Sequence, residues 1–261
     1  MSLPPQFTLD SLVDETLWLD EVESTNSFLA ERTNFGSALA LSWNQTGGRG
    51  RRGREWVSPA SGSLALSVAL WPHLVPQPLT PEWLGSVSLL TGACLADAIR
   101  PHLAEPVRIK WPNDVLIGGK KVAGILGEVS GSGRVVMGVG LNVSLAEAEL
   151  PTENATSLSL HSVRPLGQLE RIIGAFLGEL RHTLAGLDNG LSGERHAWVS
   201  EQCDTLGREV SVELPGGVAR RGRAMQLDES GRLLVHFDDR GATEPVEAAD
   251  VTHLRPADLS D

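Results

Sequence analysis

This chain of 261 residues is poor in cysteine and has no long apolar run. Its two cysteines, Cys94 and Cys203, lie far apart and form no disulfide or metal-ligand pattern, as is typical of a cytoplasmic protein with free thiols. No stretch approaches the ~18 apolar residues of a membrane span. The first residues, MSLPPQFTLD, lack the basic start and apolar run of a signal peptide. We therefore expect a globular cytoplasmic protein that does not associate with membranes.

Lysine is the second scarce residue. The chain has nineteen arginines but only three lysines, Lys110, Lys120 and Lys121, and all three lie within twelve residues. A lysine ammonium is a compact point charge, whereas a guanidinium is a wider planar fork, so arginine cannot always replace lysine. The cluster therefore indicates a site that needs an ammonium; chance clustering is the alternative.

Positive charge in general is also scarce, because the formal net charge is -11. This acidity disfavours general binding to nucleic acid or to anionic membranes. The segment GGRGRRGR, residues 47–54, is the exception, with four arginines among four glycines. We call it the arginine loop. Glycines favour mobility and close backbone approach, and guanidinium groups bind phosphates, so a lid over phosphates is one interpretation.

Three other interpretations of the arginine loop compete with a lid. Gly48, Gly50 and Gly53 have the spacing of a dinucleotide-binding turn, but the following EWVSPASGSLALS does not read as the helix that such a turn needs. A nucleic-acid patch would have more aromatic residues than Trp56 and a less acidic remainder. A plain solvated basic loop would not need so much glycine.

Periodicity and turn residues predict an α+β fold in two parts. The expected elements are a strand near 15–22, a helix over 23–32, strands over 37–44 and 62–71, a helix over 81–103, an antiparallel β meander over 106–144, and helices over 166–187 and near 193–203. The expected turns of the meander are at Gly118-Gly119 and at SGSG, 130–133. In 62–71, leucine and valine alternate with small residues, which predicts a strand buried on one face only.

The character of the sequence changes near Leu206. Short alternating segments follow, separated by PGG, DESG and DDRG, which are turn sequences. They predict a small β-barrel. We therefore expect a catalytic domain over 1–204, with a mixed sheet backed by helices, and a small β domain over 205–261.

Four motifs together resemble one enzyme family. QTGGRGRRGREWVSP, KWPNDVLIGGKKVAGILGE and GVGLNV, preceded by ESTN, resemble the biotin protein ligases in order and spacing. The C-terminal β segment resembles their SH3-like domain. The resemblance implies that the biotin carboxylate attacks the α-phosphorus of Mg-ATP, giving biotinyl-5′-AMP and pyrophosphate. It also implies transfer to one lysine of the biotin carboxyl carrier domain of acetyl-CoA carboxylase or a related carboxylase.

The resemblance is to the short form of the family. Repressor-type members carry an N-terminal winged helix-turn-helix, and this sequence leaves no room for one before ESTN. We therefore expect no specific binding to DNA. The oligomeric state is not determined by the sequence, and a homodimer is one option.

The resemblance also assigns residues to the site. Lys121 is expected to be the catalytic ammonium between the biotin carboxylate and the α-phosphate, with Arg51 as a second catalytic charge. Lys120 should point to the opposite side of the strand. The residues expected around biotin are Ser24, Thr25, Asn26, Gln45, Gly48, Arg49, Gly50, Arg51, Lys121, Gly124, Gly138 and Gly140. Those expected around the nucleotide are Arg51, Arg54, Trp56, Lys110, Asn113 and Asn142.

Several of these residues also have a purely structural explanation. Ser24 or Thr25 can cap a helix, the strand glycines can be ordinary bulge positions, and Trp56 can belong to the core. Arg52 can simply be exposed. Asp114 can orient the acceptor lysine, help to hold a metal, or form a turn after proline. The seven histidines have no ligand spacing, so no metal site is fixed by the sequence beyond the Mg²⁺ that accompanies ATP.

Three other functions fit less well. A lipoate ligase of the same superfamily would have an apolar tunnel in place of polar partners for the biotin ring, and the arginine loop argues against it. A transcriptional regulator that only senses biotin would need a DNA-binding domain. A basic-loop RNA-binding protein is disfavoured by the net charge.

The two adjacent lysines give a test of this assignment. Lys121→Arg keeps the charge but changes its shape, so it should slow adenylate formation at least tenfold, about 1.4 kcal/mol of barrier. Lys120→Arg should be nearly neutral. Adenylate formation and transfer to an acceptor would be measured separately. If the two phenotypes are exchanged, the strand register is off by one and the roles of the two lysines change places.

Overall fold

The computed structural model describes residues 9, 12–32, 36–56, 61–76, 79, 81–162, 169–187, 190–213, 218–246 and 250–253. Its centre is a seven-stranded sheet in the order β1-β2-β3-β7-β6-β5-β4. β1 and β2 are parallel, and every other neighbouring pair is antiparallel. The mixed sheet and the helices that cover it confirm the predicted α+β class.

The elements follow the predicted order closely. The strands of the large sheet are β1 (Glu15–Trp18), β2 (Ala38–Ser42), β3 (Ser63–Ala69), β4 (Val107–Lys110), β5 (Asp114–Ile117), β6 (Lys120–Val129) and β7 (Val135–Asn142). The helices are α1 (Thr25–Glu31), α2 (Pro81–Ile99), α3 (Leu169–Leu184) and α4 (Gly193–Gln202). The expected helix over 81–103 ends at Ile99 and continues as a 3₁₀ turn, Arg100–His102, which contains Pro101.

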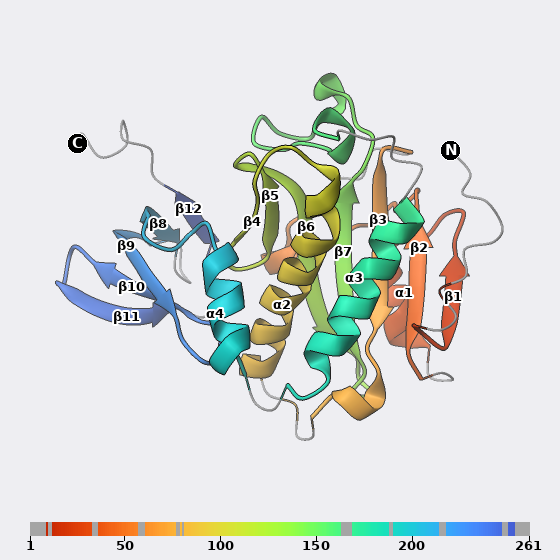
Figure 1. Ribbon diagram of the computed structural model, residues 1–261, viewed down its shortest axis with the longest axis horizontal. Helices are drawn as coiled ribbons and strands as arrows, with labels where there is room; N and C mark the ends of the chain where they lie inside the picture. Colours follow the sequence, from red (N-terminus) through yellow and green to blue (C-terminus); the bar gives the residue numbers. More distant parts are fainter. Residues whose placement is uncertain are drawn as a thin grey trace.

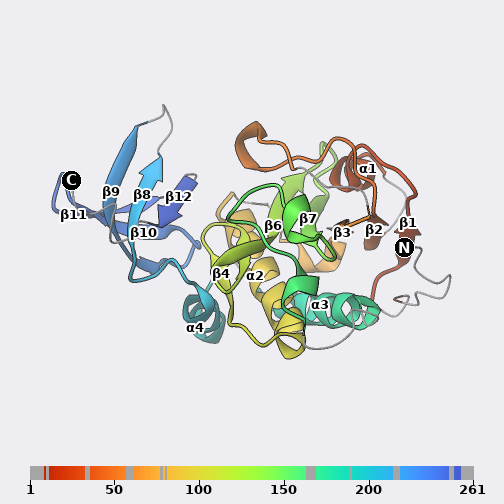
Figure 2. The same cartoon turned by 90° about the horizontal axis from the view of Figure 1, so that it is seen from above.

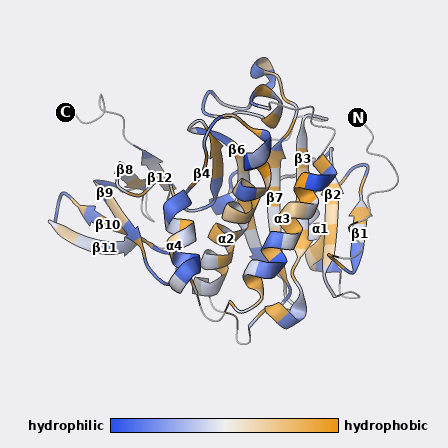
Figure 3. Cartoon of the chain, in the orientation of Figure 1, coloured by the Kyte–Doolittle hydropathy of each residue, from blue (hydrophilic) through white to orange (hydrophobic). Residues whose placement is uncertain are grey.

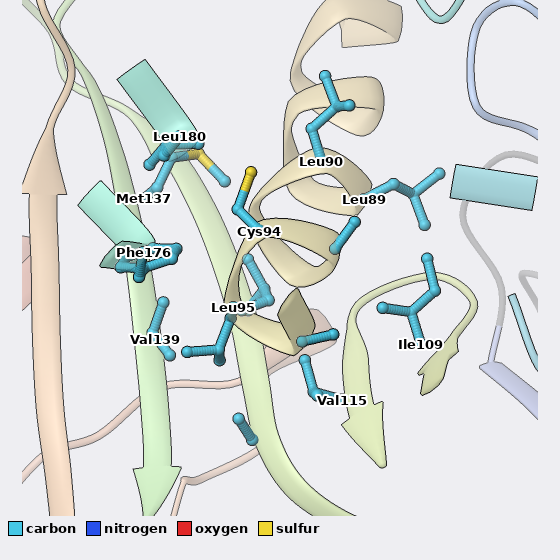
Figure 4. Close-up of a cluster of buried hydrophobic side chains, with 14 of the residues drawn as sticks. Leu89, Leu90, Cys94, Leu95, Ile109, Val115, Met137, Val139, Phe176 and Leu180 are labelled. Atoms are coloured by element: carbon cyan, nitrogen blue, oxygen red, sulfur yellow. The ribbon is translucent and has the colours of Figure 1, made fainter. Parts of the chain in front are cut away.

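Helices cover both faces of the large sheet. α2 and α3 lie on one face and α1 lies on the other, as the view from above shows (Figure 2). α3 is amphipathic, since its buried residues recur every three or four positions. In Figure 3 its turns alternate between blue and orange, while β2 and β3 are mostly orange. Figure 4 shows Phe176 and Leu180 of α3 together with Met137 and Val139 of β7 and Leu95 of α2.

The prediction that strand 62–71 is buried on one face only was wrong. All seven residues of β3 are buried, because α1 packs on one side of the strand and the α2–α3 layer on the other. The small residues that alternate with the leucines, such as Ala65 and Ser67, are therefore interior positions. In the sequence, large apolar residues that alternate with small ones give the same two-residue period as apolar residues that alternate with exposed polar ones.

The meander and its turns are as predicted. β4, β5, β6 and β7 pair antiparallel in chain order. Gly118 and Gly119 have φ of 55° and 83°, and Gly133 has φ of 80°, in the left-handed region that favours glycine. Ser24 is the N-cap of α1, where its Oγ accepts a 3.4 Å hydrogen bond from Ser27 N.

A second sheet follows α4 (Figure 1). Its strands are β8 (Glu209–Glu213), β9 (Ala219–Leu227), β10 (Leu233–Phe237), β11 (Ala242–Val246) and β12 (Asp250–His253), in the antiparallel order β11-β10-β9-β8-β12. This agrees with the expected small β domain. The expected PGG turn, 215–217, and the expected helix start, 166–168, lie outside the described residues.

The two sheets are joined by buried hydrogen bonds. Trp111 Nε1 donates to Gly231 O at 2.9 Å, and Trp111 N donates to Thr205 Oγ1 at 3.0 Å. Both tie the turn between β4 and β5 to the C-terminal part, so the second sheet has a fixed place beside that turn. None of the helices in the described part of the chain is long and apolar enough to cross a membrane.

The packing of α3 on the sheet makes a stability prediction. Phe176 is fully buried between α3 and the sheet, so Phe176→Ala should lower the free energy of unfolding by about 3–5 kcal/mol. Arg171→Ala, on the exposed side of the same helix, should change it by less than about 0.5 kcal/mol. Urea unfolding measures both; equal effects would show that α3 does not pack as described.

Candidate active site

A cavity of about 300 Å³ lies beside the start of α1. Residues from several parts of the chain line it: the start of α1, Gln45, the arginine loop, the turn between β4 and β5, the central strands β3, β6 and β7, and strands β8 and β12 of the second sheet. The sequence-predicted residues that line it are Ser24, Thr25, Asn26, Gln45, Arg49, Gly50, Arg51, Arg54, Trp56, Lys110, Asn113, Asp114, Lys121, Gly124, Gly138 and Gly140.

Two predicted residues do not line this cavity. Asn142 is buried with both ends of its amide engaged: Nδ2 donates to Thr156 O at 2.9 Å, and Oδ1 accepts from Ser63 Oγ at 3.0 Å. Gly48 lies behind the wall, where a Cβ would be 2.5 Å from Trp56 O and 2.7 Å from Gln45 Nε2. Gly48 is therefore the residue that lets the arginine loop close against Gln45.

Of the three lysines, Lys110 and Lys121 line the cavity. Lys121 Nζ lies 2.6 Å from Asp114 Oδ1, across the β5–β6 pair, and 5.3 Å from the centre of the Trp56 ring. Lys120 is exposed and does not line the cavity, as strand alternation predicts. The register of the two lysines is thus the one expected.

Three strand glycines form part of the cavity floor because side chains lie directly on them. A Cβ on Gly138 would be 2.3 Å from Asn26 Oδ1, and one on Gly140 would be 2.3 Å from Trp56 Cε2. A Cβ on Gly124 would be 3.1 Å from Trp56 Cζ3 and 3.2 Å from Lys121 Nζ. The Trp56 indole therefore rests on Gly124 and Gly140, and its buried Nε1 has no hydrogen-bond partner among the described residues.

A hydrogen-bond network fixes the polar end of the cavity. Gln45 Oε1 accepts from Thr25 N at 2.9 Å and from Thr25 Oγ1 at 3.2 Å. Ser67 Oγ on β3 contacts Thr25 Oγ1 at 2.7 Å and Asn26 Oδ1 at 2.6 Å. Asn26 Nδ2 donates to Glu128 Oε2 at 2.7 Å. These buried groups hold one another in place, which preorganises them for a polar ligand.

The arginine loop forms a defined turn over the cavity. Gly50 N donates to Arg54 O, Trp56 N donates to Gly48 O, and a 3₁₀ turn spans Arg51–Gly53. The next described element is strand β3 rather than a helix, so the turn lacks the context of a dinucleotide-binding fold.

The four arginines differ in environment. The Arg49 guanidinium is 3.2 Å from Glu128 Oε1 and 2.6 Å from Ser27 Oγ. Arg51 is partly buried, whereas Arg52 and Arg54 are exposed. Arg52 has φ of 56°, and its Nη1 donates to Glu213 O at 3.3 Å. Arg51 and Arg54 line the cavity and Arg52 does not.

Sequence reasoning missed the part of the cavity that comes from the second sheet. Glu213 of β8 and Val251 and Thr252 of β12 line it, 70 residues or more beyond the last motif, which ends at Val143. No short-range pattern marks them. It also missed apolar wall residues between the motif residues, such as Trp111, Ile125 and Val139, although their neighbours in sequence were predicted.

A second cavity of about 320 Å³ adjoins the first. The two share Arg51, Asn113, Ile125, Leu126 and the cis Trp111–Pro112 pair. Leu84 and Leu89 of α2 make the second cavity more apolar. Neither cysteine lines either cavity. Both thiols are free and buried, and burial raises the pKa of each, so neither is a nucleophile.

Comparison with known proteins places this arrangement in a family. Residues 18–143 match the model of the Biotin/lipoate A/B protein ligase family, and residues 205–254 match that of the Biotin protein ligase C terminal domain. A Biotin--[acetyl-CoA-carboxylase] ligase of Mycobacterium tuberculosis is 38% identical over 239 residues, which cover 89% of this chain and 86% of the relative. The chain belongs to the biotin protein ligase family.

Two further relatives agree with this family. The Bifunctional ligase/repressor BirA of Escherichia coli is 30% identical over 249 residues, covering 92% of this chain and 74% of the relative. The structure of biotin protein ligase from Aquifex aeolicus in complex with biotin and ATP superposes with a TM-score of 0.73 at 26% identity, covering 92% of this chain and 99% of that one. The second family model also distinguishes this chain from a lipoate ligase, the alternative left by the sequence.

The contact between Trp56 and the glycine floor can be tested directly. Gly140→Ala places a methyl group where the indole lies, so Trp56 should be displaced and become more accessible to acrylamide quenching. Gly131→Ala is the matched control, because nothing lies within 4 Å of its added Cβ. The quenching difference should disappear when both variants carry Trp56→Phe. A Gly140→Ala protein with wild-type quenching would contradict the contact.

Proposed function

We propose that this chain forms biotinyl-5′-AMP from biotin and Mg-ATP and transfers the biotinyl group to a lysine of a biotin carboxyl carrier domain, that of acetyl-CoA carboxylase or a related carboxylase. The observation that carries the proposal is the position of Lys121. Its ammonium lines the same cavity as the polar, hydrogen-bonded residues at the start of α1 and the arginine loop, and it is held by Asp114 at 2.6 Å. A carboxylate from one side and a phosphate from the other meet at this charge.

The first step needs two anions to approach. A biotin carboxylate oxygen attacks the α-phosphorus, a new P–O bond forms, and the bond to pyrophosphate breaks. Lys121 stabilises the negative charge on both reactants, and Arg51 and Arg54 bind phosphate oxygens. Fixed positive charge is effective here because it needs no reorganisation during the reaction.

The ring of biotin occupies the polar end of the cavity in this proposal. Ser24, Thr25 and Gln45 supply oxygen and amide groups for its ureido function. Gly138 and the backbone of Gly50 leave room for the bicycle and the chain. Asn26 acts indirectly, because Ser67 and Glu128 already occupy its amide.

The nucleotide lies toward the loop and the β4–β5 turn. Trp56 Nε1 offers a buried donor, and Lys110 and Asn113 line the wall beside it. Among the described residues, no three His, Cys, Asp or Glu side chains gather to hold a metal ion. Mg²⁺ bound mainly by nucleotide phosphates fits this, since one or two carboxylates suffice, and Asp114, Glu55 and Glu213 line the cavity. Bound there, Mg²⁺ neutralises phosphate charge.

In the second step the ε-amine of the acceptor lysine attacks the carbonyl carbon of biotinyl-5′-AMP. A C–N bond forms, the C–O bond to the phosphate breaks, and AMP leaves while the amine loses a proton. Asp114 is placed to orient that amine, because its carboxylate already holds an ammonium, that of Lys121. The arginine loop acts as a lid that keeps water from the reactive anhydride.

The remaining expectations are part of the same proposal. The two free cysteines agree with action in the cytoplasm. The net charge of -11 supports the expectation that the chain has no specific DNA partner. A homodimer stays a prediction for solution measurements.

The decisive experiment is biotin-dependent exchange between ATP and pyrophosphate. Exchange should require biotin and should not occur with lipoate, and addition of a biotin carboxyl carrier domain should yield one biotinylated lysine. Exchange with lipoate alone would favour the alternative, a lipoate ligase. Absence of exchange with either acid would refute the proposed activity.

The proposed roles of the loop arginines predict different rates of adenylate release for variants of the adjacent residues Arg51 and Arg52. Arg51→Ala should release biotinyl-5′-AMP roughly 10- to 100-fold faster, because a charge-assisted phosphate contact is worth about 1.5–3 kcal/mol. Arg52→Ala should retain the adenylate, since Arg52 does not line the cavity. Stopped-flow release of the adenylate measures both. Equal retention by both variants would show that another arginine holds the phosphate.

A further inference from the structure

The backbone of Lys121 lies beyond the ladder that joins β6 to β7. That ladder begins at the pair Ala123–Leu141. Lys121 is bonded instead to a segment that belongs to neither strand: Lys121 N donates to Asn154 O at 2.7 Å, and Thr156 N donates to Lys121 O at 2.8 Å. A parallel bridge pairs Lys121 with Ala155. Residues 154–156 therefore extend the sheet for this one residue.

Thr156 anchors this segment to the domain. It is 2% exposed, and its carbonyl accepts a 2.9 Å hydrogen bond from Asn142 Nδ2. Its hydroxyl lies 2.7 Å from His161 Nε2. On the other side of the ring, His161 Nδ1 lies 3.0 Å from Glu105 Oε1. A continuous chain of contacts thus runs from Glu105 through His161 and Thr156 to the backbone of Lys121.

The chemistry of Glu105, His161 and Thr156 limits which atoms can donate and which can accept in this series of contacts. A carboxylate only accepts, so the proton on the Glu105 side of the ring belongs to Nδ1. On the other side of the ring, Nε2 and the Thr156 hydroxyl share a hydrogen bond whose donor is set by the tautomer of the ring. The pKa of the Glu105 carboxyl is held below its usual range by the contact with His161, so the carboxylate form persists. His161 Nδ1 and Glu105 Oε1 lie at ion-pair distance, and this contact holds the ring beside Thr156.

We propose that Thr156 is a positioning residue for Lys121, held in turn by the His161–Glu105 pair and by Asn142. The expected effect of Thr156 on catalysis rests on the proposed function. Its expected effect on the position of the Lys121 side chain does not. None of these four residues lines the main cavity. They act by setting where the strand starts, and so where the ammonium stands relative to Asp114.

Such positioning matters because a lysine side chain has four rotatable bonds, and among the described residues Asp114, at 2.6 Å, is the charged partner that holds the Lys121 ammonium. A reactive group misplaced by roughly 1 Å can cost up to about 100-fold in rate. The two backbone bonds from residues 154–156 limit that displacement at the base of the side chain. The contacts of Thr25 and Asn26 at the polar end of the cavity, with Gln45, Ser67 and Glu128, do not involve residues 154–156.

The test compares three threonine variants. Thr156→Val removes only the hydroxyl at nearly constant size, and Thr156→Ser keeps it. Thr183→Val removes a similarly buried hydroxyl from α3, where Thr183 contacts Cys94 and Glu179 and lines neither cavity. In biotin-dependent pyrophosphate exchange, Thr156→Val should lower kcat by about tenfold with KM for biotin unchanged. Thr156→Ser and Thr183→Val should resemble the wild type.

A second readout does not depend on activity. Only three lysines contribute signals when lysine is labelled with ¹³C and ¹⁵N, and Lys121 is identified by the signal that Lys121→Arg removes. Thr156→Val should shift the Lys121 side-chain signal, whereas Thr156→Ser and Thr183→Val should not. An intact far-UV spectrum and unfolding midpoint would show that the variants fold.

The outcomes separate the two proposals. A shifted Lys121 signal in a protein whose wild type shows no biotin-dependent exchange would retain the positioning role and refute the function. An unshifted signal, a Thr156→Ser variant as impaired as Thr156→Val, or a loss confined to KM for biotin would each overturn the positioning role. Equal loss in Thr183→Val would overturn it as well, by showing that any lost buried hydroxyl has the same effect.

Discussion

The ion pair between Lys121 and Asp114 is the interaction on which the rest of the site depends. The two charges lie 2.6 Å apart and are only partly exposed, so neither keeps its full hydration. A partly buried ion pair gives net stabilisation only where its geometry is well fixed, because the cost of desolvating the two charges offsets much of their attraction. The β5–β6 hairpin provides the geometry, with Gly118 and Gly119 in its turn and a bulge after Val115. The same meander carries Lys110, Asn113 and Gly124 to the cavity wall.

Neutralisation of Lys121 by Asp114 has an electrostatic consequence for the neighbouring loop. With the central ammonium already paired, the arginines supply much of the positive charge that faces the cavity from above. Arg49 is itself paired with Glu128, and Arg51 and Arg54 line the cavity beside it. The spacing R-x-R-R-x-R therefore contains guanidinium groups in three different environments, although the sequence presents them as equivalent.

Much of this architecture could be predicted from sequence because its signals are local. The helix cap at Ser24 or Thr25, the glycine turns and the alternation of Lys120 and Lys121 are each decided by a few neighbouring residues. The structure has the cap at Ser24 and agrees with the other two. Burial of β3 could not be predicted in this way, because it depends on which helices cover the two faces of the sheet. Asn142 shows the same limit: its motif was recognised, but its amide is taken up by Ser63 and Thr156, which are distant in sequence.

The three residues of the second sheet that line the cavity have a consequence for how such chains can be recombined. Glu213, Val251 and Thr252 face the arginine loop and the β4–β5 turn across one cavity, and Trp111 is bonded into the second sheet at Gly231. The change of composition near Leu206 looks like a natural crossover point between parents. A chimera joined near Leu206 would nevertheless take the two sides of a single binding surface from two different parent proteins. The halves of this chain therefore have to diverge together, and a graft that respects the boundary in sequence still needs the donor and recipient to match across the cavity.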